Sequence, residues 1–256
     1  MILGNAPLAQ QIGRSVVASG GVKAHGVIIT KVSLPHTLLR LPPGLYNRRV
    51  LKRFHVEILH LALDDVFSSR ALEKIVKANL YQDRLGGQIG HDEYHFDNNS
   101  FERSYAYIEE QRALTISSLV NNDVLSAWSA FGRLTHTAQD FYAHSNYIEL
   151  WLARQPDGMS PAPSDVHPMD PNLLHTPALR SGKVYVLEAL TMIHPIRSFV
   201  MPFLPRDSHA WLNIDSPERG SNFKYVFQAA IKRTKIEFER TTRDLPQDLF
   251  AQFVDK

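Results

Sequence analysis

The chain contains no cysteine among its 256 residues. Disulfide bonds and thiolate metal sites are therefore excluded, so a metal ion would have to be held by histidine, carboxylate, water or a chain terminus. No apolar run approaches the length of about 18 residues that a membrane-spanning helix needs. The start of the chain also lacks the basic and then apolar pattern of a Sec signal peptide. We expect a protein made in the cytosol, which is cytoplasmic or is exported by a route without a Sec signal.

An excess of either charge is absent as well. The chain has 28 basic and 26 acidic residues, a formal net charge of +2, without long blocks of like charge. This balance argues against a general polyanion binder and makes nucleic acid a weaker expectation as a partner. With 44% apolar and 21% charged residues, the composition is that of a soluble globular protein long enough to bury a core.

Apolar spacing predicts an all-α, multi-helix fold with long loops. Residues 1–46 are broken by glycine and proline and predict an extended or irregular N-terminal arm. From residue 47 to 256 the spacing becomes helical and predicts one helical domain. The predicted helices are Val50 to Leu63, Leu72 to Leu80, Phe101 to about Val120, the Asp123 cap to about Leu152, a helix from near Lys183 that is interrupted at Pro195, and one that begins at the Ser221 cap. Proline-rich residues 153–180 predict a long surface loop that serves as a wall or lid.

One motif within the predicted helix from Asp123 spaces His136, Asp140 and His144 at four-residue intervals. These three side chains share one helical face, yet the two histidines lie roughly 12 Å apart along the axis, too far to bind one zinc ion together. The spacing therefore favours a multi-metal cluster in which Asp140 bridges two ions. The alternative interpretation is a solvated helix face.

Further candidate ligands lie elsewhere in the chain. Asp83 and His95 flank a glycine-rich loop that can bring them to one ion, although both residue types also serve turns well. His55 lies on the first predicted helix, and His209 follows the proline-rich region. Asp97 is a candidate to brace a metal-bound histidine.

Three segments together resemble the zinc-dependent phospholipase C superfamily, within it the branch related to fungal Het-C proteins. They are His55 to Ile58, Asp83 to His95-Phe96-Asp97, and Leu134 to Asn146, with a weaker echo at His209 to Pro217. The resemblance covers roughly residues 50 to 240. It rests on order, spacing and ligand type together, because each short motif alone is weak.

The resemblance implies an all-helical fold of the phospholipase C and zinc nuclease type, with two or three zinc ions that hydrolyse a phosphodiester. One ion would bind Asp83, His95, His136 and Asp140, a second Asp140 and His55, and a third His144. Asp83 would also act as the general base. The implied substrate is a phospholipid or small phosphodiester, with peripheral membrane contact.

The chain departs from that family in two places. The family completes one site with an N-terminal tryptophan amine, whereas some fifty residues precede His55 here; His25 and His36 are the candidates to replace it. The family's His-x-x-x-Glu pair is missing after His144, where His209, His175 and Asp215 are the candidates.

Other functions remain open at this point. They are a nuclease of the same superfamily, a non-catalytic Het-C-like interaction module on a metal-stabilised scaffold, and an exported effector lipase. The sequence does not predict an oligomeric state.

Overall fold

The computed structural model describes residues 48–256 except 89, 157 and 189–193. All regular elements in these residues are helical, and extended pairing is limited to two isolated bridges. The prediction of an all-α fold is confirmed. The predicted arm, residues 1–46, with His25 and His36, lies outside the described residues.

The described helices differ widely in length, from single turns to more than five turns. The α-helices are α1 Arg48–Leu63, α2 Ser69–Tyr81, α3 Leu85–Gln88, α4 Asp92–His95, α5 Phe101–Val120, α6 Val124–His144, α7 Tyr147–Ala153, α8 Pro171–Leu174, α9 His194–Val200, α10 His209–Leu212, α11 Phe223–Thr242 and α12 Gln247–Val254. The 3-10 turns are η1 Asp97–Asn99, η2 Pro163–Asp165, η4 Met201–Phe203 and η5 Pro217–Arg219.

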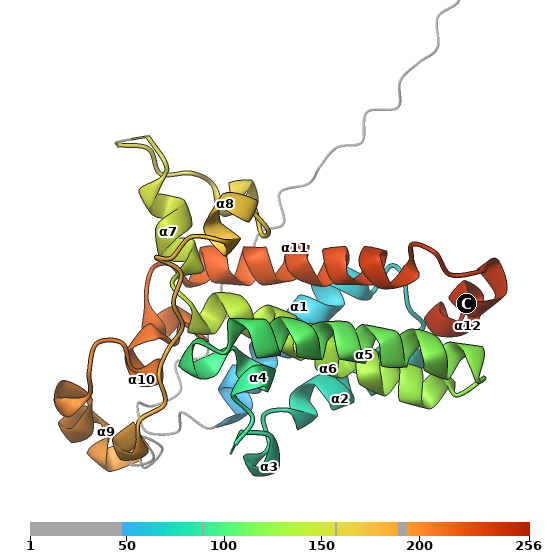
Figure 1. The fold of residues 1–256 in the computed structure, drawn as a ribbon, viewed down its shortest axis with the longest axis horizontal. Helices are drawn as coiled ribbons and strands as arrows, with labels where there is room; N and C mark the ends of the chain where they lie inside the picture. Colours follow the sequence, from blue (N-terminus) through green and yellow to red (C-terminus); the bar gives the residue numbers. More distant parts are fainter. Residues whose placement is uncertain (1–47, 89, 157, 189–193) are drawn as a thin grey trace, which may run out of the picture. The chain divides into compact units, whose positions relative to one another are not determined.

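Helix α6 is the centre of the packing. It contacts α2, α5 and α11 most extensively, and α4, α7, α10 and α12 to a smaller extent. Figure 1 shows α5, α6 and α11 as three long helices with similar directions. Every residue from Leu134 to Ile148 is buried, so this stretch is enclosed on all sides rather than amphipathic. Polar side chains on it must therefore find their partners inside the protein.

An aromatic core closes one end of the bundle. The rings of Phe67, Phe131 and Phe253 pack with centroids 5.0 to 5.9 Å apart, a range favourable for aromatic pairs. The Trp128 indole N–H donates to the Phe253 carbonyl at 2.7 Å and thereby fastens α12 to α6. Sequence patterning did not predict α12.

The predicted helix from Asp123 to Leu152 is in fact two helices. Asp123 caps α6 by accepting the Ser126 N–H, as predicted, but Ser145 is extended and pairs with Ser181. Asn146 follows, and its side chain accepts from the Arg180 N–H and donates to the Ala178 carbonyl. These contacts with a segment more than thirty residues away end α6, so the single-helix prediction is wrong at Ser145.

Another predicted helix, from Lys183, is also wrong at its start. Lys183 forms a bridge with Ser208, and its backbone exchanges hydrogen bonds with Asp207 and His209. The next α-helix in the described residues is His194–Val200. The predicted interruption at Pro195 adjoins residues 189–193, which lie outside the described residues.

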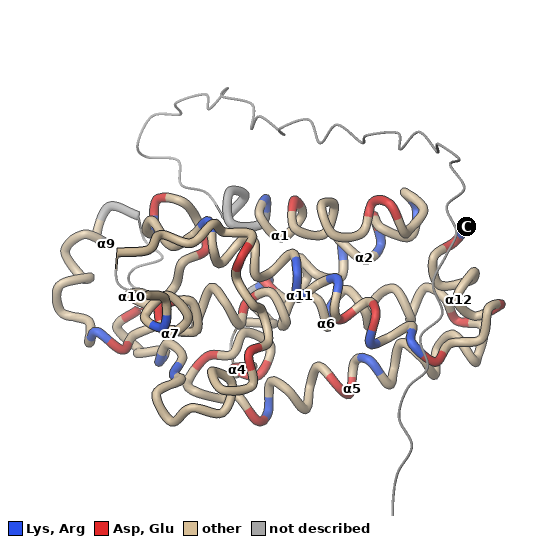
Figure 2. The backbone as a smooth tube through the Cα atoms, turned by 90° about the horizontal axis from the view of Figure 1, so that it is seen from above, with Lys and Arg blue, Asp and Glu red and all other residues tan. Residues whose placement is uncertain are grey.

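Charges are dispersed over the described helices. Figure 2 shows Lys and Arg interspersed with Asp and Glu along the backbone, in keeping with the near-neutral composition. No described helix combines the length and apolar character needed to cross a membrane.

Gly132 permits the close approach of α6 to α2. A Cβ atom added there would lie 2.4 Å from the Ile75 carbonyl oxygen and 2.8 Å from the Ala78 Cβ. We expect Gly132→Ala to lower the free energy of unfolding by about 1–3 kcal/mol, because overpacking against backbone outweighs the gain in helix propensity of about 1 kcal/mol. Chemical denaturation measures the change. Gly86→Ala is the matched control, since its Cβ would meet nothing within 4 Å; equal stabilities of the two variants would contradict close packing at Gly132.

Candidate metal centre

The three motif residues of α6 are all inside the protein. His136 is 0% exposed, Asp140 2% and His144 6%, so the alternative of a solvated helix face is wrong. The His136 Nε2 lies 3.1 Å from Asp140 Oδ2 within the helix. His144 falls in a separate group of side chains, in agreement with the distance along the helix that the spacing predicts.

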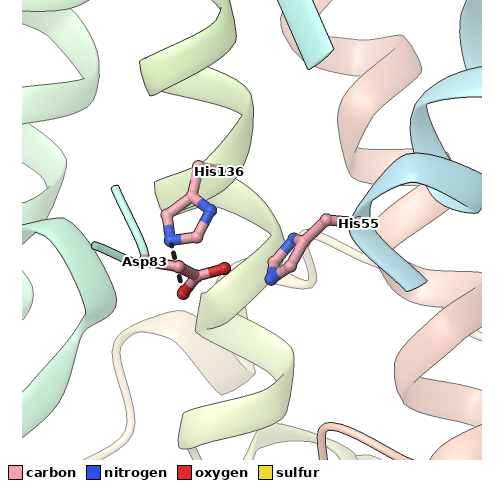
Figure 3. A group of neighbouring side chains, drawn as sticks. All are labelled: His55, Asp83 and His136. Carbon is pink, nitrogen blue, oxygen red and sulfur yellow. Dashed lines mark ion pairs between the residues drawn. The ribbon is translucent and has the colours of Figure 1, made fainter. Parts of the chain in front are cut away.

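Three other segments bring side chains to the first turn of this motif. His55 comes from α1, Asp83 from the turn after α2, and His95 from the end of α4; Figure 3 shows His55, Asp83 and His136 converging from separate elements. We call His55, Asp83, His95, His136 and Asp140 the inner group. The possible metal-holding sets within it are His55 with Asp83 and His136, and His95 with His136 and Asp140.

Asp140 stands between two sets of histidines. Its Oδ1 lies 3.3 Å from His55 Nε2, whereas its Oδ2 lies 2.8 Å from His95 Nδ1 and 3.1 Å from His136 Nε2. Asp83 Oδ1 lies 3.8 Å from His136 Nε2. The two carboxylate oxygens of Asp140 thus face different imidazoles, which is the arrangement that a bridging carboxylate requires.

Each inner histidine is held from outside by a neutral oxygen. His55 Nδ1 lies 2.7 Å from Gln139 Oε1, His95 Nε2 lies 3.2 Å from the Gly87 carbonyl, and His136 Nδ1 lies 3.4 Å from Asn79 Oδ1. Such partners orient the ring and favour a proton on the outer nitrogen. In that tautomer the inner nitrogens are lone-pair donors that face the carboxylates.

The turn before His95 depends on a glycine. A Cβ on Gly87 would lie 2.2 Å from the Gln82 carbonyl oxygen, so no larger residue fits without a shift of the backbone. Gly87 also supplies the carbonyl that holds His95. The glycine-rich segment includes the short helix α3. Asp83 and His95, predicted to meet at one ion, fall in two different possible metal-holding sets that share His136.

A second cluster, which we call the outer group, contains Asp97, His144, His209 and Asp215. The first three form a possible metal-holding set. His144 Nδ1 lies 3.2 Å from Asp97 Oδ1 and donates to the His95 carbonyl at 2.9 Å, and His144 Nε2 lies 3.4 Å from Asp215 Oδ1. Asp97 Oδ1 is buried without a hydrogen-bond partner. A buried carboxylate oxygen of this kind is costly unless a cation or a donor faces it.

The sequence analysis identified the members of the outer group only in part. Asp97 was predicted only to brace a ligand, yet it lies among the donors themselves. Asp215, one of three candidates to complete the site, faces His144, whereas His175 is exposed and belongs to neither group. The loop of residues 153–180 supplies no member to either group, so among its described residues nothing supports a wall or lid over the centre.

Burial and charge shift the protonation of these groups. Burial alone would raise the pKa of Asp140, but His136 and His144 hold that pKa well below its usual value. Burial likewise opposes ionisation of Asp215, and His144 nevertheless lowers its pKa to about 2. Burial lowers the pKa of His136. These directions favour carboxylates at Asp140 and Asp215 and a neutral imidazole at His136, the forms that bind metal ions. Neighbouring carboxylates raise the pKa of His55, His95 and His144 in spite of burial.

Comparison with known proteins finds a family match for part of the chain. Residues 60–163, less than half of the chain, match the family described as the VWA7 N-terminal domain. The chain is also similar to von Willebrand factor A domain-containing protein 7 of Rattus norvegicus, with 33% identity over 94 residues. That alignment covers 35% of this chain and 10% of the relative, so the chain spans about a tenth of that protein's length. No solved structure matches the chain.

These matches overturn the resemblance on which the predicted function rested. Both point to the VWA7 N-terminal domain and neither to the zinc-dependent phospholipase C superfamily or its Het-C-like branch. The prediction of a zinc-dependent phosphodiester hydrolase is therefore wrong, as are its nuclease and Het-C-like alternatives. The general-base role of Asp83 was implied by the resemblance alone and is not carried forward. The matched range nevertheless contains six members of the two groups: Asp83, His95, Asp97, His136, Asp140 and His144.

Proposed function

We propose that the chain is a helical domain that binds divalent transition-metal ions, with zinc the first candidate. The observation that carries this proposal is the convergence of three histidines and two carboxylates in the inner group. Imidazole nitrogen and carboxylate oxygen are suitable zinc ligands in a protein without cysteine. The proposal rests on the donor chemistry of this chain and not on its relatives, whose names specify no ligand.

Repulsion between lone pairs is the strongest argument for a cation. His136 Nε2 and His95 Nδ1 lie 3.2 Å apart, and both face Asp140 Oδ2. If the outer nitrogens carry the protons, these three atoms are all electron-pair donors directed at one another. A proton or a metal ion must lie among them, and a metal ion satisfies all three at once.

The two carboxylate oxygens of Asp140 face different histidines, which supports two ions in the inner group. His95 and His136 with Asp140 Oδ2 would hold one ion, and His55 with Asp140 Oδ1 would contribute to the second. Asp83 joins His55 and His136 in one set, so it would serve the side of the group nearer to His55. Two cations would also offset the charge of both carboxylates, of which Asp140 is buried.

The outer group would hold a further ion. Asp97, His144 and His209 supply three protein donors, and Asp215 beside His144 can supply a fourth, the number typical of a structural zinc site. These residues come from η1, the end of α6, and the segment around α10. An ion here would therefore join the segment after residue 181 to the central helix.

Metal content is the first test. Purified protein reconstituted with zinc should contain two or three equivalents by inductively coupled plasma mass spectrometry. Asp140→Asn and His136→Ala should lose inner ions, and His144→Ala should lose only the outer one. His60→Ala is the matched control, because His60 is an exposed histidine already paired with a carboxylate, Asp64. Absence of stoichiometric metal in the folded wild type would refute the proposal.

Gln139 offers a test of how the inner histidines are held. Its side chain lies against His55 and accepts from Asn79. Gln139→Leu should preserve volume but release His55, and should weaken zinc affinity about 10–100-fold. Competition with a chromophoric chelator measures the affinity. Gln247→Leu, on the surface of α12, should leave the affinity unchanged, and equal affinities of the two variants would contradict the assigned role.

Removal of metal should loosen one segment more than the rest. The outer group connects Asp97 and His144 to His209 and Asp215, whereas much of α6 is held by apolar packing. After chelation, hydrogen exchange should accelerate in residues 201–219 before it does in 124–138. Uniform acceleration, or none, would show that the outer group does not fasten this segment through a metal ion.

A further inference from the structure

A buried cluster of arginines lies among α5, α6 and α11, and the proposed metal centre does not use it. Arg233 of α11 is 0% exposed, and Arg112 of α5 is 7% exposed. Both guanidinium groups bind the carboxylate of Glu237, which is itself 0% exposed. Arg240 also lies near Glu237, at 3.6 Å, and Glu109 pairs with Arg112 at the surface. The cluster therefore holds three guanidinium groups and two carboxylates.

The donors of Arg233 are only partly satisfied. Its Nε donates to Glu237 Oε1 at 2.5 Å, but Nη1 and Nη2 are buried without a hydrogen-bond partner. These two nitrogens carry four N–H groups. The Tyr105 hydroxyl is likewise buried without a partner, and the Arg233 guanidinium carbon lies 5.9 Å from the Tyr105 ring centroid. Unmatched donors thus gather in one interior region.

The buried carboxylate of this region is already used as an acceptor. Glu237 Oε1 accepts from Arg233 Nε, and Glu237 Oε2 accepts from Arg112. The neighbouring Tyr142 hydroxyl is engaged as a donor to the Pro168 carbonyl. On the other side Tyr105 packs against the rings of Phe96 and Phe141, which offer no conventional acceptor.

We propose that the Arg233 guanidinium and the Tyr105 hydroxyl bind a small monovalent anion of the chloride class. An anion accepts hydrogen bonds without donating any, which suits this set of donors, whereas each water molecule would bring two protons that need acceptors. The excess of one guanidinium over the carboxylates matches a single negative charge. Close packing by aromatic rings favours a monatomic ion over sulfate or phosphate.

Bromide crystallography on the wild-type protein tests the site directly. Crystals grown in sodium bromide should show an anomalous peak within hydrogen-bond distance of Arg233 Nη and Tyr105 Oη. Density at this place without an anomalous signal would identify water and overturn the proposal. The measurement needs no variant, so it does not depend on whether a substitution of buried Arg233 folds.

Anion-dependent stability tests binding in solution. At constant ionic strength, replacing isethionate by chloride should raise the melting temperature by about 5 °C, because the ion binds only the folded protein. Tyr105→Phe removes one donor and should raise the chloride dissociation constant about tenfold. Tyr81→Phe is the matched control, since exposed Tyr81 also stands beside an arginine, Arg84.

Each remaining outcome decides the proposal. Equal melting temperatures in the two salts would overturn it, and a bromide peak without chloride-dependent stability would mean binding at crystal concentration only, which also overturns it. An identical chloride response in Tyr105→Phe and Tyr81→Phe would exclude Tyr105 from the site. Metal content should be unchanged in Tyr105→Phe, so this test is independent of the proposed metal centre.

Discussion

The complete burial of α6 over Leu134 to His144 is the constraint on which the rest of the structure depends. A helix enclosed on every side ordinarily carries apolar residues, yet this one also carries two histidines and an aspartate. Their desolvation would be costly unless the surrounding elements supplied partners. The local structure around α6 supplies these polar partners, in part through short helices that have little stability of their own.

The polar groups of α6 also explain why the small elements lie where they do. Helix α4 has only four residues, far fewer than an isolated helix needs. His95 lies against Asp140 and the Gly87 carbonyl at the same time, and a proton or a metal ion between His95 and Asp140 would hold α4 in place. Similarly, α10 is a single turn whose first residue, His209, joins the outer group. Contacts with the buried polar groups of α6 thus stabilise α4 and α10, whereas apolar packing stabilises α2, α5 and α11.

Sequence reasoning succeeded where structure is set locally and failed where it is set by distant contacts. The apolar repeat gave α5 its bounds, and the four-residue spacing on α6 gave His136 and Asp140 a shared face. By contrast, the end of α6 depends on Ser181 and the segment before it. The sequence near Ser145 contains no pattern that predicts this pairing. Asp97 was underrated for the same reason, because His209 is 112 positions away and only the fold makes them neighbours. The donors of Arg233 had no local signal at all.

The mistaken family assignment has a physical lesson of its own. Histidine and aspartate at four-residue intervals on a buried helix meet a general requirement, which is that two donor side chains lie on one face and share a cation or a proton. Any helical protein that buries such a cluster converges on similar spacing, whatever chemistry follows. Reaction type depends instead on what else approaches the ion: an open coordination position, a substrate cavity and a group to transfer protons. In this protein the inner histidines are enclosed by Asn79, Gln139 and the Gly87 carbonyl. Those contacts explain how the donors are oriented, and they are equally compatible with a centre that stabilises the fold. A ligand set therefore supports the inference of metal binding more strongly than that of a reaction.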